Sequence, residues 1–130
     1  MNVALLIVFT TGLLVVLFRL LLSFGAPYAG SSEERVMDIL KLAGNLEDKK
    51  VADLGSGDGR IVVECAKRGA YAVGYEINPL LVYRSRKRIK AEGLSDRATI
   101  LWRSYWGDNL GKYDVITVYG IGAMMRRLEK

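Results

Sequence analysis

The sequence predicts an α/β fold, a doubly wound parallel sheet with helices on its faces. Short apolar runs of strand length alternate with segments of helical periodicity along most of the chain. The first run leads into glycines that alternate with other residues, at Gly55, Gly57 and Gly59, and acidic residues stand within or at the end of two runs, at Asp53 and Glu76. Because consecutive parallel strands need a crossover, usually a helix, this alternation indicates right-handed βαβ units.

The first element, residues 1–25, is expected to be a transmembrane anchor. Residues 3–24 carry no charge except Arg19, and about twenty apolar residues in a helix cross a hydrocarbon core of ~30 Å. A cleaved signal peptide would have positive charge before its apolar run, and only Asn2 and the amino terminus precede this one. A signal peptide and a buried core helix are the two alternatives.

The positive charge near this segment predicts its orientation. Arg19, Arg35 and Lys41 all lie at its end or beyond it, and basic residues favour the cytoplasmic side. We therefore expect a single-pass membrane protein with its amino terminus outside and its domain on the cytoplasmic side.

Residues 26–50 are expected to form a linker and a first helix. Ser31 and Glu34 have the spacing of a capping box, and apolar residues then recur at helical intervals to residue 43. Residues 51–130 form the expected core. Its strands are predicted at 51–54, 70–76, 98–103 and 113–119, and its helices at 60–68, 79–92 and from about 122.

Amino-acid usage excludes several chemistries. The chain of 130 residues has room for one compact domain, and it has no histidine and a single cysteine, Cys65. An internal disulfide, a histidine-based triad and a Cys/His metal site are therefore excluded, and no metal is expected. Cys65 falls on a predicted amphipathic helix, where a core position is the favoured interpretation and a nucleophile the alternative.

The carboxyl ends of the first two strands carry the candidate ligand site, since doubly wound sheets bind ligands there. Alternating glycines permit a tight turn and let a ligand approach the amides at the start of the next helix. Glu76 ends the second strand, where a carboxylate can accept hydrogen bonds from both hydroxyls of a ribose. Asp53 and Asp58 bring two further acidic side chains to this region.

Two cofactor classes use a glycine loop of this kind. A dinucleotide site needs Gly-x-Gly-x-x-Gly, and Arg60 stands where its third glycine would be. The form Asp-x-Gly-x-Gly-x-Gly suits a ligand with an amino group and no phosphate, such as S-adenosyl-L-methionine, with Asp53 and the loop facing the ammonium and Glu76 the ribose. We favour a methyl-donor site in a Rossmann-like sheet; a dinucleotide site and a purely structural turn are the alternatives.

Three groups of residues resemble a known family. They are Asp53-Leu-Gly-Ser-Gly-Asp-Gly-Arg-Ile-Val62; Ala72-Val-Gly-Tyr-Glu-Ile-Asn-Pro79 with Leu81-Val82 and Ser85-Arg86; and Tyr119-Gly120 with Met124-Met125 and Leu128-Glu-Lys130. They are similar to the membrane-associated seven-β-strand (class I) protein-lysine methyltransferases, which include the ATP synthase c-subunit and adenine nucleotide translocase lysine methyltransferases and prokaryotic relatives. The resemblance covers about residues 26–130. It implies a lysine of a protein as methyl acceptor, with a membrane protein as candidate, and, in a eukaryote, the mitochondrial inner membrane. No nucleic-acid partner is expected, because no segment resembles an RNA-binding motif or an aromatic stacking platform.

The loop pattern and the resemblance together give the expected cofactor-binding residues, which are Asp53, Gly55, Ser56, Gly57, Asp58, Gly59, Glu76, Ile77, Asn78 and Ser104. The family has Asp-Leu-Trp after its third strand, where this chain has Ser104-Tyr-Trp106; Asp108 is close enough in sequence to supply the missing carboxylate. Pro27-Tyr28 matches the start of a family segment that lies over the cofactor.

Methyl transfer to a lysine requires a neutral nitrogen in line with the sulfonium methyl group. A free lysine has a pKa near ~10.4, so it must first lose a proton. Without histidine, Tyr28, Tyr119 and Asp108 are the candidates to assist, and water is the alternative acceptor. Tyr28 and Tyr119 are the expected catalytic residues, although Tyr119 fits a packing role equally well.

The family's fold orders its sheet 3-2-1-4-5-7-6, and the elements expected here stop after the helix that follows strand four. An apolar fourth strand would then be an exposed edge, which proteins usually avoid. We expect the sequence to be the amino-terminal half of a longer protein, apparently truncated after strand 4; a partner chain on that edge is the alternative.

Two further features have several interpretations. Arg84-Ser-Arg-Lys-Arg-Ile-Lys90 places five cations in seven residues; a solvated helix face is favoured over attraction to anionic lipid and over nucleic-acid binding. Trp102 and Trp106 flank the end of the third strand, where they can pack under the site or rest at a membrane interface.

Three classes of function remain. A membrane-anchored protein-lysine N-methyltransferase is favoured. A small-molecule or lipid methyltransferase would share the cofactor half, and a non-catalytic S-adenosylmethionine-binding fragment would keep the fold alone. The sequence predicts no oligomeric state.

Overall fold

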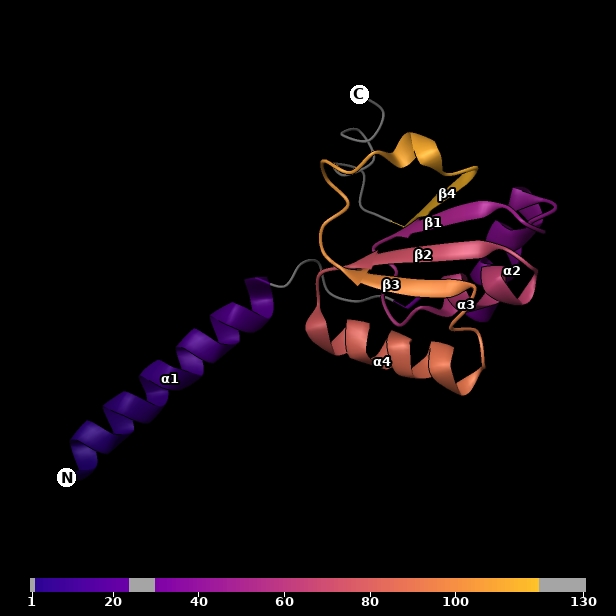
Figure 1. Cartoon of the computed structure of the whole chain (residues 1–130). Helices are drawn as coiled ribbons and strands as arrows, with labels where there is room; N and C mark the ends of the chain where they lie inside the picture. Colours follow the sequence, from indigo (N-terminus) through magenta and orange to yellow (C-terminus); the bar gives the residue numbers. More distant parts are fainter. Residues whose placement is uncertain (1, 24–29, 120–130) are drawn as a thin grey trace.

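The computed structural model describes residues 2–23 and 30–119 and shows an N-terminal helix followed by an α/β domain (Figure 1). Tyr28, Met124-Met125 and the helix predicted from about residue 122 lie outside the described residues. The elements in chain order are α1 (Val3–Ser23), α2 (Glu33–Ala43), β1 (Lys50–Leu54), α3 (Arg60–Lys67), β2 (Tyr71–Glu76), α4 (Pro79–Ala91), β3 (Ala98–Trp102), the short 3-10 helix η1 (Leu110–Lys112) and β4 (Val115–Val118).

The four strands form one parallel sheet in the order β3-β2-β1-β4. This confirms the predicted fold class and the 3-2-1-4 order of its first half. Asp53 on β1 pairs in register with Gly74 on β2 and with Thr117 on β4. The carboxyl ends of β1, β2 and β4 therefore lie together, with the glycine loop between them.

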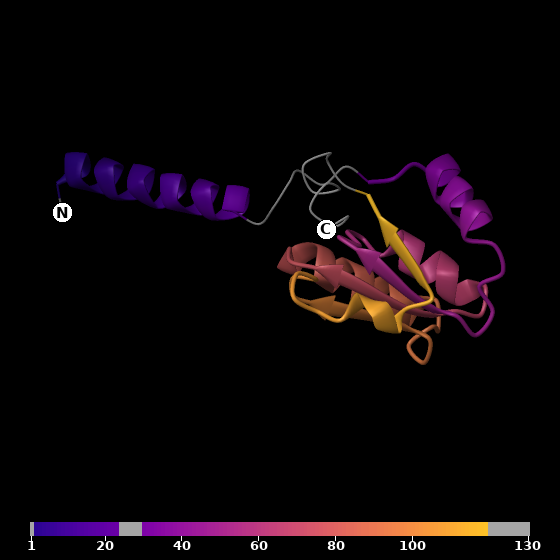
Figure 2. The same ribbon diagram turned by 90° about the horizontal axis from the view of Figure 1, so that it is seen from above.

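Helices α2, α3 and α4 pack on one face of the sheet (Figures 1 and 2). Their buried apolar side chains meet alternate residues of the strands, such as Val51, Ala72 and Ile100. On the opposite face a smaller cluster joins Leu54, Tyr75 and other apolar residues, under the segment between β3 and β4. The sheet is thus covered by helices on one face and by an extended segment on the other.

Most strands and helices begin and end within one residue of the prediction, and two differences have a clear physical cause. The N-cap of α2 is Ser32, whose side chain accepts from the Arg35 amide (3.4 Å), so the capping box expected on Ser31 and Glu34 is displaced by one residue. Strand β4 begins only at Val115 because the Asp114 carboxylate takes the Lys50 amide (2.8 Å) before the ladder starts.

Helix α1 does not pack against the α/β domain. The stretch Val3–Leu20 has a mean hydropathy of 2.5, and none of it is buried in the protein. By length and composition, the helix is long and apolar enough to cross a membrane. The hydroxyls of Thr10 and Thr11 donate to carbonyls one turn earlier, which satisfies them within the helix. This exposure argues against the buried core helix and leaves an anchor and a signal sequence.

Candidate functional site

The loop from β1 to α3 is built on three glycines in the left-handed region, with φ of 77° at Gly55, 56° at Gly57 and 77° at Gly59. The amides of Gly55 and Ser56 both donate to the Tyr75 carbonyl at 2.9 Å. These bonds hold the loop against the end of β2. A Cβ added at Gly55 would meet nothing within 4 Å, so the space over this part of the loop is open.

Two close approaches fix the loop from below. A Cβ on Gly59 would lie 2.7 Å from the Ser85 Cβ, and a Cβ on Gly74 would lie 2.5 Å from the Ser56 Oγ. The start of α3 can therefore pack directly on α4, and the loop directly on β2. Ser85 belongs to the residues that resemble the known family, but sequence reasoning gave it no packing role; its small size amid the larger residues of α4 was the available signal.

The Glu76 carboxylate ties the loop to the end of β2. Its Oε2 accepts from the Gly57 amide (2.9 Å), and its Oε1 accepts from the amides of Ile77 and Asn78 (2.8 Å each). The residue is 8% exposed. A carboxylate offers about four acceptor positions, so three backbone bonds leave capacity for a ligand hydroxyl.

Asp53 lies buried beneath the loop and accepts a hydrogen bond of 2.7 Å from the Thr117 hydroxyl. Burial raises the pKa of this carboxyl to about 7; the Thr117 hydrogen bond opposes the rise, and the nearby Glu76 charge adds to it. A cation placed near Asp53 would favour its charged form and lower this pKa again. The site thus contains a carboxyl group that a positively charged ligand would ionise.

The Asp58 carboxylate joins the loop to two basic side chains. It contacts the Arg60 guanidinium at 2.9 Å and the Arg88 guanidinium at 3.1 Å. Arg60 also donates to the Ser31 carbonyl ahead of α2. The Asp58 side chain therefore holds the loop against α4 and, through Arg60, against the segment before α2. Sequence reasoning treated Arg60 only as a missing glycine and did not foresee this role.

Ser56 has a buried Oγ that finds no hydrogen-bond partner among the described residues. A buried hydroxyl without a partner is costly. This hydroxyl lies against Gly74 beneath the loop, where a buried water could bond to it.

The segment after β3 makes hydrogen bonds within the protein. The Ser104 hydroxyl accepts from the Trp106 amide (3.2 Å) in a local turn. Asp108 accepts from the Tyr75 hydroxyl (2.5 Å) and pairs with Arg103 (2.6 Å), on the sheet face opposite the helices. The Tyr75 hydroxyl, together with the Arg103 charge, holds the Asp108 pKa below its ordinary value in spite of partial desolvation. Asp108 is therefore engaged by Tyr75 and Arg103 on that face.

Tyr119 directly follows β4, at the same edge of the sheet as the glycine loop. Its hydroxyl accepts from the Arg35 guanidinium of α2 at 2.7 Å, and its ring is 49% exposed. The side chain is thus held in place yet accessible. Tyr28, the other expected catalytic residue, lies outside the described residues.

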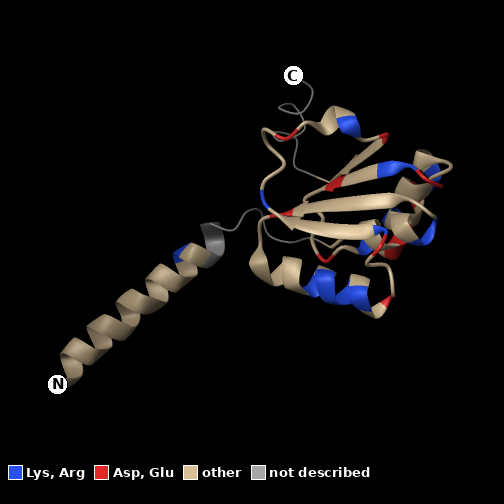
Figure 3. Cartoon of the chain, viewed as in Figure 1, with Lys and Arg blue, Asp and Glu red and all other residues tan. Residues whose placement is uncertain are grey.

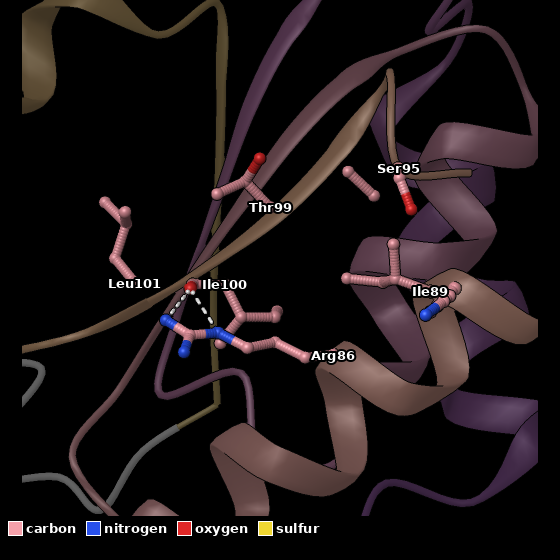
Figure 4. A pocket seen from close by; sticks show the side chains of 8 residues that line it. Arg86, Ile89, Ser95, Thr99, Ile100 and Leu101 are labelled. Atoms are coloured by element: carbon pink, nitrogen blue, oxygen red, sulfur yellow. Dashed lines mark hydrogen bonds between the residues drawn. The ribbon is translucent and has the colours of Figure 1, made fainter. Parts of the chain in front are cut away.

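A groove on the surface of the domain lies away from this loop. It measures about 380 Å³, runs between α4 and the outer edge of β3, and has Ile89, Ser95 and Thr99 among its lining residues (Figure 4). There Arg86 donates to the Ile100 carbonyl (2.9 Å) and so occupies an acceptor on the outer edge of β3 that another strand could otherwise use. Within residues 2–23 and 30–119, no cluster of three or more Cys, Asp or Glu side chains could hold a metal ion.

The sheet order, the glycine loop and the acid ending β2 define the class of S-adenosylmethionine-dependent methyltransferases. The crystal structure of an RNA methyltransferase from Salinibacter ruber with S-adenosyl-L-homocysteine superposes with a TM-score of 0.72 at 32% identity, over 78% of this chain and 67% of that one. The C-terminal domain of precorrin-6Y C5,15-methyltransferase from Rhodobacter capsulatus has the same fold, with a TM-score of 0.68 at 20% identity, over 82% of this chain and 60% of that one.

Residues 53–130 match the model of the ANTKMT methyltransferase domain, and the chain belongs to this family. It is 38% identical over 104 residues to the ATP synthase c-subunit lysine N-methyltransferase of Xenopus laevis, which is 80% of this chain and 46% of that protein. It is 32% identical over 110 residues to a protein-lysine N-methyltransferase of Saccharolobus islandicus, covering 80% and 68%. The adenine nucleotide translocase lysine N-methyltransferase of Mus musculus is 34% identical over 112 residues, covering 85% and 48%. The chain spans about half the length of the vertebrate relatives.

The family is S-adenosylmethionine-dependent, and the residues present fit this cofactor. Glu76 retains acceptor capacity beside the loop, and Gly55 leaves open space over it. Asp53 adds an acid that a positively charged group would ionise.

Proposed function

We propose that this protein is an S-adenosylmethionine-dependent methyltransferase acting on a lysine side chain of another protein. The main support for cofactor binding is the Glu76 carboxylate, which accepts hydrogen bonds from the glycine loop and can still accept one from a ligand. The acceptor half is supported by several relatives, all named lysine N-methyltransferases.

The expected cofactor residues take distinct roles in this proposal. Glu76 receives the ribose hydroxyls, while the open backbone surface over Gly55 lies along the methionine part. The Asp53 carboxyl, below the loop, is ionised when the ammonium group of the cofactor lies near it. Ile77, Asn78 and Ser104 border the adenine end.

The bound cofactor supplies a methyl group on a sulfonium, and the protein supplies alignment. Tyr119 is held by Arg35, which occupies one lone pair of its hydroxyl. The second lone pair can accept a hydrogen bond from the lysine amine, which positions the nitrogen. Water takes the lysine proton, since Asp108 is bound to Tyr75 and Arg103. Tyr28 is proposed to act beside Tyr119.

We also propose that α1 anchors the protein in a membrane, with the domain on the cytoplasmic side and a membrane protein as substrate. The support is the length and apolar character of α1 and the basic residues after it. Protease protection in sealed vesicles tests this orientation, and digestion of the domain from the outer face would overturn it.

RNA is the second candidate acceptor, because the Salinibacter ruber protein, an RNA methyltransferase, is 32% identical. Incubation of the protein with membranes, total RNA and a donor labelled in its methyl group separates the candidates. We expect label in protein lysines by mass spectrometry. Label in RNA, lipid or small molecules alone would contradict the proposed acceptor.

Calorimetry with S-adenosylmethionine tests the cofactor site. Because Glu76 joins loop and ligand, Glu76→Ala should weaken binding by at least about 30-fold, the loss expected for a bond to a charged group together with its loop contacts. The matched control is Glu47→Ala, an exposed acid at the amino-terminal end of the sheet. Equal binding by both variants, or no binding by the parent protein, would contradict the cofactor assignment.

A further inference from the structure

One side of α4 carries exposed apolar and cationic side chains together. Tyr83 and Arg84 lie three and four residues after Leu80, and Lys87 lies four and three residues after them, which places the four on one helix face. The opposite face, including Leu81 and Ile89, is buried against the sheet. We call the four exposed residues, together with Trp102, the α4 face.

Trp102 extends this face at the amino-terminal end of α4. Its indole N–H donates to the Ile77 carbonyl at 3.0 Å, which fixes the ring next to the start of the helix. The ring is 60% exposed, and Leu80 and Tyr83 are 57% and 64% exposed. Three large apolar side chains in water at one end of a helix are costly, so they favour a covering partner.

The charge on α4 is one-sided. Its thirteen residues include five cations and no acid, and Figure 3 shows blue along its carboxyl-terminal half with no red on the helix. Arg86 bonds to the Ile100 carbonyl and Arg88 to Asp58. Arg84, Lys87 and Lys90 form no ion pair within the described part of the chain. The covering partner should therefore be anionic.

A bilayer surface meets both requirements, because tryptophan and tyrosine settle at the headgroup level and basic residues are attracted to anionic lipid. The chain also brings the domain close to one. Nine residues separate the end of α1 from the start of α2; fully extended, they reach roughly 30 Å. If α1 spans a membrane, the domain cannot leave its surface by more than this.

We propose that the α4 face docks on an anionic lipid surface, with Leu80, Tyr83 and Trp102 at the headgroup level and Arg84 and Lys87 over the anionic lipid. This proposal uses the anchoring part of the proposed function but not the methyl-transfer activity. It places α4 against the bilayer and so fixes how the domain sits on the membrane.

Tryptophan fluorescence tests the docking directly. The chain has two tryptophans, so Trp106→Phe leaves Trp102 as the only one. The full chain is reconstituted in vesicles with brominated acyl chains, of phosphatidylcholine alone or with phosphatidylglycerol as about a third of the lipid. We expect strong quenching and a blue shift of Trp102 with the anionic lipid only, reversed when salt is raised to ~1 M.

The charge variants identify the residues involved. Arg84→Gln with Lys87→Gln should lower the ratio of docked to free domain by about 30-fold. Lys49→Gln with Lys50→Gln is the matched control, since both side chains are exposed and lie at the opposite ends of the strands; it should leave the ratio unchanged. Equal quenching in the two lipids, equal loss in the two variants, or quenching relieved by a short single-stranded RNA at normal salt would overturn docking on lipid.

Flotation with zwitterionic vesicles separates this proposal from the anchor. A chain that floats with them but shows no lipid-dependent change at Trp102 retains the anchor and overturns the docking. A chain that fails to float yet binds anionic vesicles through Trp102 supports the docking and overturns the anchor.

Discussion

At the residue scale, the buried Asp53 makes stability depend on pH. Its pKa rises from 3.8 to about 7, first through burial, with Thr117 opposing and Glu76 adding to the rise. Between these values the folded protein binds more protons than the unfolded chain. The free energy of unfolding therefore falls as the pH rises through this window and levels off above it.

Asp53→Asn should remove this slope, because an amide does not titrate. Urea unfolding in detergent at about pH 5 and about pH 8 measures the difference. The parent protein is expected to be less stable at the higher pH by a few kcal/mol, and the variant nearly equal at both. Asp96→Asn, at an exposed position, should keep the parent's slope. A slope that survives in Asp53→Asn would show that another group carries it.

At the element scale, the contact between α3 and α4 depends on Gly59. An alanine there would need a left-handed φ of 77° and would place its Cβ 2.7 Å from the Ser85 Cβ. The strain and the overlap together should cost about 3 kcal/mol of unfolding free energy. Gly93→Ala is the matched control, since φ is 67° but nothing lies within 4 Å, and it should cost about 1 kcal/mol. Equal losses in urea titrations would refute the packing argument.

The elements themselves were largely predictable because their signals are local. Asn78 before Pro79 marked the start of α4, and its side chain does accept from the Leu80 amide (3.0 Å). The errors arose where distant groups compete for the backbone. Asp114 reaches across to the Lys50 amide and shortens β4, and the Ser31 carbonyl is taken by Arg60 while Ser32 caps α2. Such pairings need the fold before they can be seen.

The candidate site was predictable in its backbone and less so in its side chains. The glycine loop and the acid at Glu76 follow from alternation and strand ends, and they lie together in the structure. The positions of Asp58 and Asp108 did not follow, since each carboxylate is directed by cations or hydroxyls far away in sequence, Arg88 for the first and Tyr75 for the second.

At the scale of the whole molecule, the two faces of the sheet are unequally covered. The helices bury one face, whereas on the other Ile116 of β4 is 43% exposed beside the partly buried Val118. Strand β4 pairs with β1 on one side, and within residues 2–23 and 30–119 no strand pairs with its other side. An apolar edge of this kind promotes association between chains.

Ile116→Lys should therefore reduce self-association of this chain, because a charge on the open strand opposes edge pairing and apolar contact. Sedimentation velocity in detergent over a range of protein concentrations measures the change as a shift toward the monomer. Leu42→Lys is the matched control: Leu42 is 89% exposed on α2, on the helical face, and its replacement should leave association unchanged. If both variants shift equally, net charge rather than the β4 edge governs association; if neither shifts, contacts elsewhere in the chain hold the copies together.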